Sequence, residues 1–119
     1  MNSRTSLGPR AILFRLGGSL EAELSEALST TSCQVQSALA PIPSTGQEIV
    51  FCCAGADFPV ARSTFPQSPL VVVSRLPDTG EWLDALEGGA VDYCAAPFES
   101  IQMKWLLEKH IPQHFTAVA

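Results

Sequence analysis

The chain has 119 residues, 46% of them hydrophobic, and its 7 basic and 12 acidic residues give a formal net charge of −5 at pH 7. This length predicts a single domain, residues 1–119, with its core at about 10–110. The acidic balance and the absence of a Lys or Arg cluster argue against direct nucleic-acid binding. No apolar run approaches the roughly 18 residues of a membrane span, and the first ten residues lack the apolar core of a signal peptide. We therefore expect a cytoplasmic protein with no membrane contact.

The first third of the chain predicts a buried strand, a helix and an edge strand. Residues 10–16 form an apolar run that only Arg15 interrupts, which is typical of a buried parallel strand. Two glycines turn the chain, Ser19 can cap a helix, and apolar residues at helical spacing predict that helix over 20–29. Residues 33–37 alternate between polar and less polar side chains, which indicates a short edge strand.

The middle of the chain predicts two central strands and a well-capped helix. Residues 48–54 and 70–74 are compact apolar runs with β-branched residues, bounded by Gly or Pro. Asp78 can cap the next helix while Glu81 reaches back as its partner in a capping box. A glycine pair at 88–89 ends that helix.

The last third predicts a fifth strand over 91–95 and a final helix over 98–110, which Pro112 ends. The alternation of strands and helices predicts an α/β fold, a flavodoxin-like doubly wound sheet of five parallel strands in the order 2-1-3-4-5. The connections at 38–47 and 55–69 are rich in proline, so we expect the second and third helices to be shortened or lost.

Shortened helices would leave part of one sheet face thinly covered, because a parallel sheet normally has both faces covered. Four apolar residues of the two connections are the candidates to fill this gap: Ile42, Phe58, Val60 and Phe65. We favour packing within the molecule, and the alternative is an apolar surface that meets a partner.

Residues 80–100 read GEWLDALEGGAVDYCAAPFES and resemble the last third of a bacterial response-regulator receiver domain. They share the helix that ends in Gly and Ala, the Asp-aromatic pair that opens the last strand, and the Pro-Phe pair after it. Only 80–98 carries the likeness specifically, and elsewhere it rests on element order and strand register. The resemblance implies a module of two-component or phosphorelay signalling that is not an enzyme.

Of the positions that carry the chemistry of the family, only Ser74 keeps the family's type of residue. A receiver places an acidic pair at the end of the first strand, an acceptor Asp at the end of the third, a hydroxyl residue at the end of the fourth and a Lys in the fifth. By resemblance, these positions fall in this chain on Arg15, Leu16, Cys53, Ser74 and Ala96. Because the family uses carboxylates to hold magnesium and attack phosphorus, we expect a degenerate receiver, without a phospho-acceptor, metal or cofactor.

Other family features are retained in part. Tyr93 matches the aromatic residue whose ring turns together with the hydroxyl residue on activation, although it can equally be an ordinary strand tyrosine. The resemblance places the interaction surface on the last two helices and the strand between them, where a protein partner or a second copy would bind. Its candidate residues are Trp82, Tyr93, Phe98, Lys104 and Trp105.

Several alternatives remain open. If the register slips, Asp57 becomes the acceptor of a conventional phosphorelay receiver; otherwise Arg15 pairs with Asp57 or is simply solvated. A different class is a small flavodoxin-like domain that binds a nucleotide, flavin or other anion at the strand ends.

A third class is a redox protein that uses the Cys53 thiol. The four cysteines lack zinc-site spacing, and we favour reduced thiols packed as small hydrophobic residues. His110 and His114 are interpreted as solvated.

Overall fold

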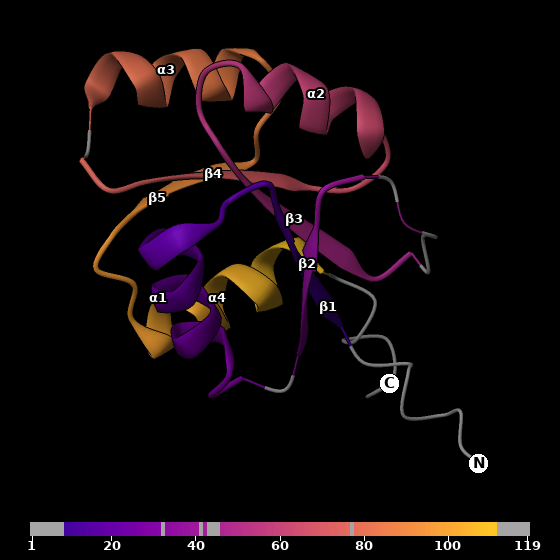
Figure 1. The fold of residues 1–119 in the computed structure, drawn as a ribbon, viewed down its shortest axis with the longest axis vertical. Coiled ribbons are helices and arrows are strands. Elements are labelled where there is room, and N and C mark those ends of the chain that lie inside the picture. The colour runs from indigo at the N-terminus through magenta and orange to yellow at the C-terminus, as the bar shows by residue number, and fades with distance from the viewer. Residues whose placement is uncertain (1–8, 32, 41, 43–45, 77, 112–119) are drawn as a thin grey trace.

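The computed structural model describes residues 9–31, 33–40, 42, 46–76 and 78–111. The described residues form five parallel strands in one sheet, in the order β2-β1-β3-β4-β5, and four helices (Figure 1). The strands are β1 Arg10–Phe14, β2 Gln34–Ala38, β3 Glu48–Cys53, β4 Leu70–Ser74 and β5 Asp92–Ala95. The helices are α1 Gly18–Leu28, α2 Asp57–Thr64, α3 Thr79–Glu87 and α4 Ser100–His110. The predicted doubly wound, flavodoxin-like fold is confirmed.

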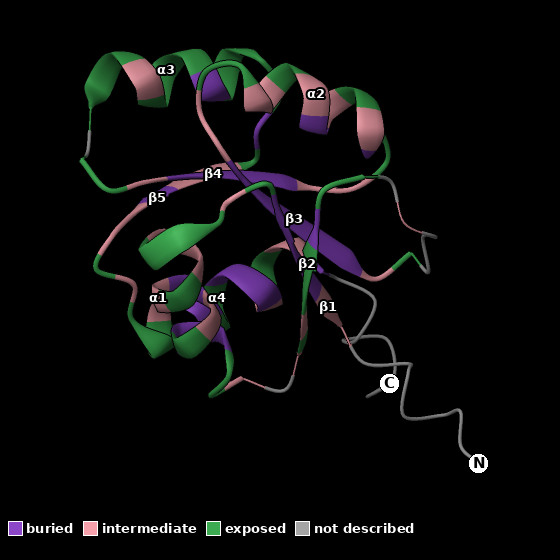
Figure 2. Cartoon of the chain, viewed as in Figure 1, coloured by how far each residue is buried: buried purple, intermediate pink, exposed green. Residues whose placement is uncertain are grey.

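The helices form a layer on each face of the sheet, with α1 and α4 on one side and α2 and α3 on the other (Figure 1). Successive side chains of a strand point to opposite faces, so β1 places Leu13 in the core under α1 and α4, and Phe14 in the core under α2 and α3. The three central strands are buried on both faces, whereas β2 is largely exposed at one edge (Figure 2). This explains the continuous apolar runs of the central strands.

The largest differences from the predicted boundaries are at the end of β1 and at the starts of α1 and α4. β1 ends at Phe14 because Arg15 adopts a left-handed backbone with φ 58°. α1 begins two residues early, at Gly18, with Gly17 as its N-cap. The Oγ of Ser19 accepts a hydrogen bond from Arg75 Nη2 at 2.9 Å instead of capping the helix. α4 begins at Ser100 after an extended Glu99.

The two proline-rich connections differ in their helix content. The described residues between β2 and β3 include no helix, while α2 survives as 8 residues between β3 and β4, so the expected shortening or loss is confirmed there. Phe65 is buried edge-on against Phe14, with 5.4 Å between ring centroids. The other three candidates, Ile42, Phe58 and Val60, also pack against this core. These four apolar residues therefore cover the sheet face by packing within the molecule, as we favoured.

Pro41, Pro43, Pro112 and His114 lie outside the described residues.

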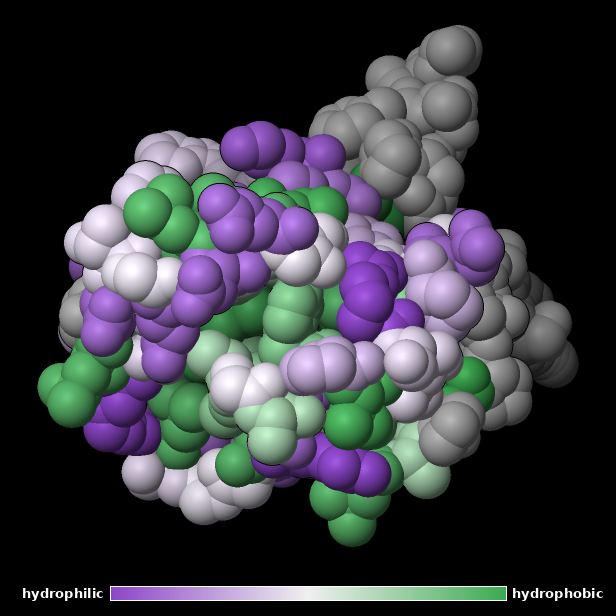
Figure 3. Space-filling view, turned by 90° about the horizontal axis from the view of Figure 1, so that it is seen from above, coloured by the Kyte–Doolittle hydropathy of each residue, from purple (hydrophilic) through white to green (hydrophobic). Residues whose placement is uncertain are grey.

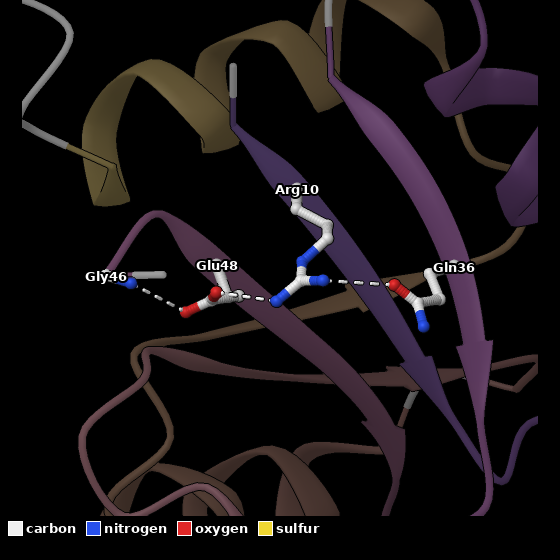
Figure 4. A network of polar contacts seen from close by, with 4 residues as sticks. All are labelled: Arg10, Gln36, Gly46 and Glu48. Carbon is white, nitrogen blue, oxygen red and sulfur yellow. Dashed lines mark hydrogen bonds and ion pairs between the residues drawn. The ribbon is translucent and has the colours of Figure 1, made fainter. Parts of the chain in front are cut away.

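At the amino ends of the strands, a buried ion pair joins β1 to β3 (Figure 4). Arg10 Nη2 lies 2.8 Å from Glu48 Oε2, and the Glu48 side chain is 2% exposed. Arg10 Nη1 also donates to Gln36 Oε1 of β2 at 3.2 Å, and the Gly46 amide donates to Glu48 Oε1 at 3.2 Å. One guanidinium thus contacts side chains of both neighbouring strands.

None of the described helices combines the length and the apolar character that a bilayer crossing requires.

Candidate functional site

The carboxyl ends of the parallel strands bring the five degenerate-site positions to one edge of the sheet. Cys53 ends β3, and Ser74 ends β4, where it pairs in register with Ala95 of β5. Arg15 and Leu16 follow β1, and Ala96 follows β5. This edge is the usual ligand crevice of an open α/β sheet. The positions are therefore grouped as the parallel order requires, while the roles inferred by resemblance stay predictions.

Arg15 lies over this edge and faces the start of α2. Its Nη1 is 3.8 Å from Asp57 Oδ1, its Nε donates to the Leu39 carbonyl at 3.4 Å, and its guanidinium carbon lies 5.1 Å from the centroid of the Phe14 ring. The side chains of the pair are 42% and 35% exposed. Because water partly screens it, such a pair contributes at most about 1 kcal/mol to stability. The Arg15–Asp57 ion pair is therefore present, and the Arg15 side chain is also partly solvated.

The residues at this edge do not fit a magnesium ion. Mg²⁺ requires an octahedral set of oxygen ligands, and here the Asp57 carboxylate faces a guanidinium and lies near the Cys53 thiol. Thiolates select softer metals than magnesium. Across the described part of the chain, no group of three or more His, Cys, Asp or Glu side chains is placed to hold a metal ion.

The four cysteines are free thiols with different degrees of burial. Cys52 and Cys94 are buried, and burial is the main reason that the pKa of each rises to about 12. Cys33 and Cys53 are half-buried. Burial raises the pKa of Cys53 as well, and the nearby carboxylates of Asp57 and Glu81 raise it further. This environment opposes the thiolate that a redox nucleophile needs.

We expect iodoacetamide to label Cys53 more slowly in the folded protein at pH 7 than in the urea-unfolded protein. A raised pKa lowers the thiolate fraction at neutral pH, so the labelling rate should climb only as the pH passes above the ordinary thiol range. Peptide-level mass spectrometry separates Cys53 from the other three thiols. Faster labelling in the folded state would restore the redox hypothesis.

The hydroxyl groups of Ser74 and Tyr93 both make hydrogen bonds within the protein. Ser74 Oγ donates to the Leu76 carbonyl at 2.9 Å and accepts from the Leu76 amide at 3.2 Å. The Tyr93 hydroxyl donates to Glu81 Oε1 at 2.7 Å, which ties the ring to α3. Burial raises the pKa of Tyr93, and the Glu81 carboxylate adds to the rise while Ser74 opposes it. The hydroxyl proton therefore stays on Tyr93 at neutral pH.

The Tyr93 bond corrects the predicted capping box. Asp78 caps α3 as expected, because its Oδ1 accepts from the amides of Gly80 at 2.8 Å and Glu81 at 3.2 Å. The Glu81 carboxylate, however, is directed to Tyr93. The helix then ends as predicted, with Gly88 as C-cap and Gly89 at a φ of 107°.

The two tryptophans lie on the helices that flank β5. Trp82 of α3 is 45% exposed and Trp105 of α4 is 64% exposed. A hollow of about 410 Å³ lies between α3 and β5, and its lining is Asp78, Thr79, Trp82, Asp92, Tyr93 and Ala95. A second, of about 260 Å³, lies between β5 and α4 and includes Trp105, Tyr93 and Lys109. We call this region the α3–β5–α4 face; it groups Trp82, Tyr93 and Trp105.

Two other surface candidates lie elsewhere. Phe98 is half-buried and packs against the core under α1 and α4. Lys104 borders a hollow with Thr30 and Thr31, beyond the end of α1. The solvated interpretation of His110 is wrong, because its side chain is 12% exposed and its Nε2 lies 3.5 Å from Asp92 Oδ2.

No protein-family model matches the sequence, and no curated protein matches it. Solved structures do. A response regulator from Thermotoga maritima is 21% identical, with a TM-score of 0.63 over 87% of this chain and 94% of that chain. The receiver domain of sensor histidine kinase PA1611 from Pseudomonas aeruginosa PAO1, solved with magnesium in its active site cleft, is 15% identical, with a TM-score of 0.65 over 87% and 98%.

A third similar structure is the beryllofluoride-activated NtrC4 receiver domain dimer, which is 12% identical, with a TM-score of 0.64 over 88% of this chain and 98% of that chain. At these identities the likeness concerns the fold, and it extends over nearly the whole of each receiver domain.

Proposed function

We propose that this chain, which has the fold of response-regulator receiver domains, is a signalling module that has lost phosphate acceptance and acts by binding a protein. The observation that carries the proposal is the Arg15–Asp57 pair at the strand ends. It puts a cation near the position where, by resemblance, a receiver binds its metal, and Cys53 ends β3 at the position that the resemblance gives to the acceptor carboxylate. We assign no enzymatic activity to the chain and place it in the cytoplasm.

Phosphoryl transfer to this edge would lack its main sources of stabilisation. The transferred group carries charge that metal ions and a Lys neutralise in enzymes of this kind, and Ala96 offers no charge here. Asp57 is the first residue of α2, beyond the end of β3, and it faces Arg15. These contacts do not favour Asp57 as an acceptor. Nor does any observation favour a flavin or nucleotide at the edge.

The α3–β5–α4 face supports binding of a protein partner or a second copy. Exposed Trp side chains next to hollows are typical of interface anchors, because they bury a large area at a small entropic cost. The NtrC4 receiver domain has been solved as a dimer, which makes self-association a reasonable form of this binding. The net charge of −5 does not suit direct contact with nucleic acid.

We expect magnesium and beryllofluoride together to cause no saturable change in the spectra of this protein. Beryllofluoride mimics a phosphoryl group on a carboxylate, and its binding needs the metal that this edge does not fit. The measurements are backbone amide shifts by NMR and tryptophan fluorescence from Trp82 and Trp105. The receiver domain of PA1611, whose cleft coordinates magnesium, is the positive control.

A saturable response would contradict the proposal. An Asp57→Asn variant then identifies the acceptor: if this change abolishes the response, the chain is a working phosphorelay receiver that uses Asp57.

A further inference from the structure

Another hollow, of about 590 Å³, lies on the side of α3 that faces α2. Its lining is Ala54, Gly55, Phe58, Pro59, Val72, Asp78, Gly80, Glu81, Asp84 and Ala85. Trp82 belongs to the other hollow, next to β5. The helix α3 therefore lies between two hollows that share only Asp78 among their lining residues, and we call the one beside α2 the α2–α3 hollow.

The hollow exists because α2 meets α3 at the end of that helix. The Phe58 ring lies so close to Gly88 that a Cβ there would clash with it. Arg62, one turn further along α2, donates to the Gly89 carbonyl at 3.2 Å. These contacts hold α2 against the last turn of α3, while the earlier turns border open space above Val72 of β4.

The hollow combines an apolar floor with an acidic border. Ala54, Phe58, Val72 and Ala85 supply apolar surface, and seen from above, hydrophobic side chains line a recess beside a row of hydrophilic ones (Figure 3). Asp78, Glu81 and Asp84 all line the hollow. The Asp78 carboxylate caps α3 and the Glu81 carboxylate accepts from Tyr93, which leaves the exposed Asp84 as the carboxylate that an incoming cation can pair with. This volume suits one or two large side chains.

The charge at this border is not balanced by the nearest cation of α2. Arg62 Nη2 donates to the carbonyls of Phe65, Pro66 and Ser68 at 3.0–3.1 Å, and its Nη1 donates to Gly89. The guanidinium is thus used to hold the end of α2. Among the described residues, no cation or hydrogen-bond donor contacts the carboxylate of the exposed Asp84, so nothing there competes with an incoming Lys or Arg.

We propose that the α2–α3 hollow is a docking site for a basic, amphipathic segment of a partner protein. An apolar side chain of the segment enters the hollow, and a Lys or Arg side chain pairs with the Asp84 carboxylate at its border. Charge complementarity selects this occupant, since a chain of net charge −5 attracts basic segments and repels acidic ones. Glu81 also holds the Tyr93 hydroxyl, so the occupant would contact a residue that reaches the α3–β5–α4 face.

The test uses an amphipathic Lys/Leu peptide of about 14 residues, roughly four helical turns, titrated into the isotopically labelled full chain. We expect saturable amide shifts confined to the lining of the hollow, and weaker binding at higher salt. The same peptide with Glu in place of Lys should not bind. An Asp84→Lys variant should weaken binding by about tenfold or more, because like charges then meet in the complex.

A matched control separates docking from general attraction. Glu26→Lys makes the same change in net charge on an exposed residue of α1, on the opposite face of the sheet, and should weaken binding by less than about twofold. Ala54→Leu places a larger apolar side chain in the hollow without changing the charge, and it should also weaken binding.

Equal weakening by Asp84→Lys and Glu26→Lys, shifts spread over the whole surface, or binding of the Glu peptide would each overturn the proposal. None of these outcomes depends on the beryllofluoride result, so this inference and the proposed function fail separately.

Discussion

Replacing Glu48 by Ala is expected to lower the free energy of unfolding by about 3 to 5 kcal/mol, the cost of leaving one partner of a buried ion pair unpaired. Glu48 Oε2 lies 2.8 Å from Arg10 Nη2 in a site where the Glu48 side chain is 2% exposed. Removing the carboxylate leaves a largely buried guanidinium at the amino ends of β1 and β3. Urea denaturation followed by circular dichroism measures the change, with the slope m unaltered if only stability has changed.

Two controls test this explanation. The exposed pair of Arg75 and Glu23 has a comparable N–O distance of 3.1 Å, yet Glu23→Ala should cost no more than about 1 kcal/mol because water screens that pair. The double variant Arg10→Met, Glu48→Leu removes both charges and should recover most of the stability, as apolar replacements of buried ion pairs do. A Glu48→Ala effect no larger than that of Glu23→Ala would show that the buried pair does not stabilise the sheet.

The Arg10–Glu48 contact also shows where sequence patterns stop being informative. Runs of apolar residues predict the central strands because burial on both faces leaves a local signature in each strand. A contact between residues 38 positions apart depends on which strands are neighbours and on their exact register. Arg10 and Glu48 each stand at the start of an apolar run, where a charged residue is ordinarily interpreted as a solvated strand end.

The strand-end positions could be predicted, because parallel strands place all their carboxyl ends at one edge. Of the side-chain contacts near them, the Arg15–Asp57 pair was one of two alternatives that the sequence left open, whereas the partners of Glu81 and His110 could not be predicted. Glu81 three residues after Asp78 is the pattern of a capping box, but the carboxylate bonds to Tyr93, 12 residues away. His110 near the end of the last helix suggested a solvated side chain, and α4 instead packs it beside Asp92 of β5. In both cases a neighbouring strand decides between two conformations that the local sequence permits equally.

Phe65→Ala is the second change with a large expected effect, about 3 to 5 kcal/mol of unfolding free energy, as for other buried Phe-to-Ala changes. Phe65 is 7% exposed and meets Phe14 of β1 edge-on, on the face where the described residues between β2 and β3 form no helix. Its ring supplies part of the cover that a helix would otherwise give to this face. Removing it would leave a cavity next to Phe14, which the surrounding strands can fill only in part.

The matched control is Leu76→Ala, which also deletes a large apolar side chain, but from a residue that is 77% exposed. That change should alter stability by no more than about 0.5 kcal/mol. Both variants are compared by chemical denaturation and by binding of a dye that detects exposed apolar surface. These measurements distinguish the uncovering of the sheet face from a general effect of removing a hydrophobic side chain. If Phe65→Ala cost as little as Leu76→Ala, the sheet face would be held by other contacts, and the shortened connections would have needed no compensation from Phe65.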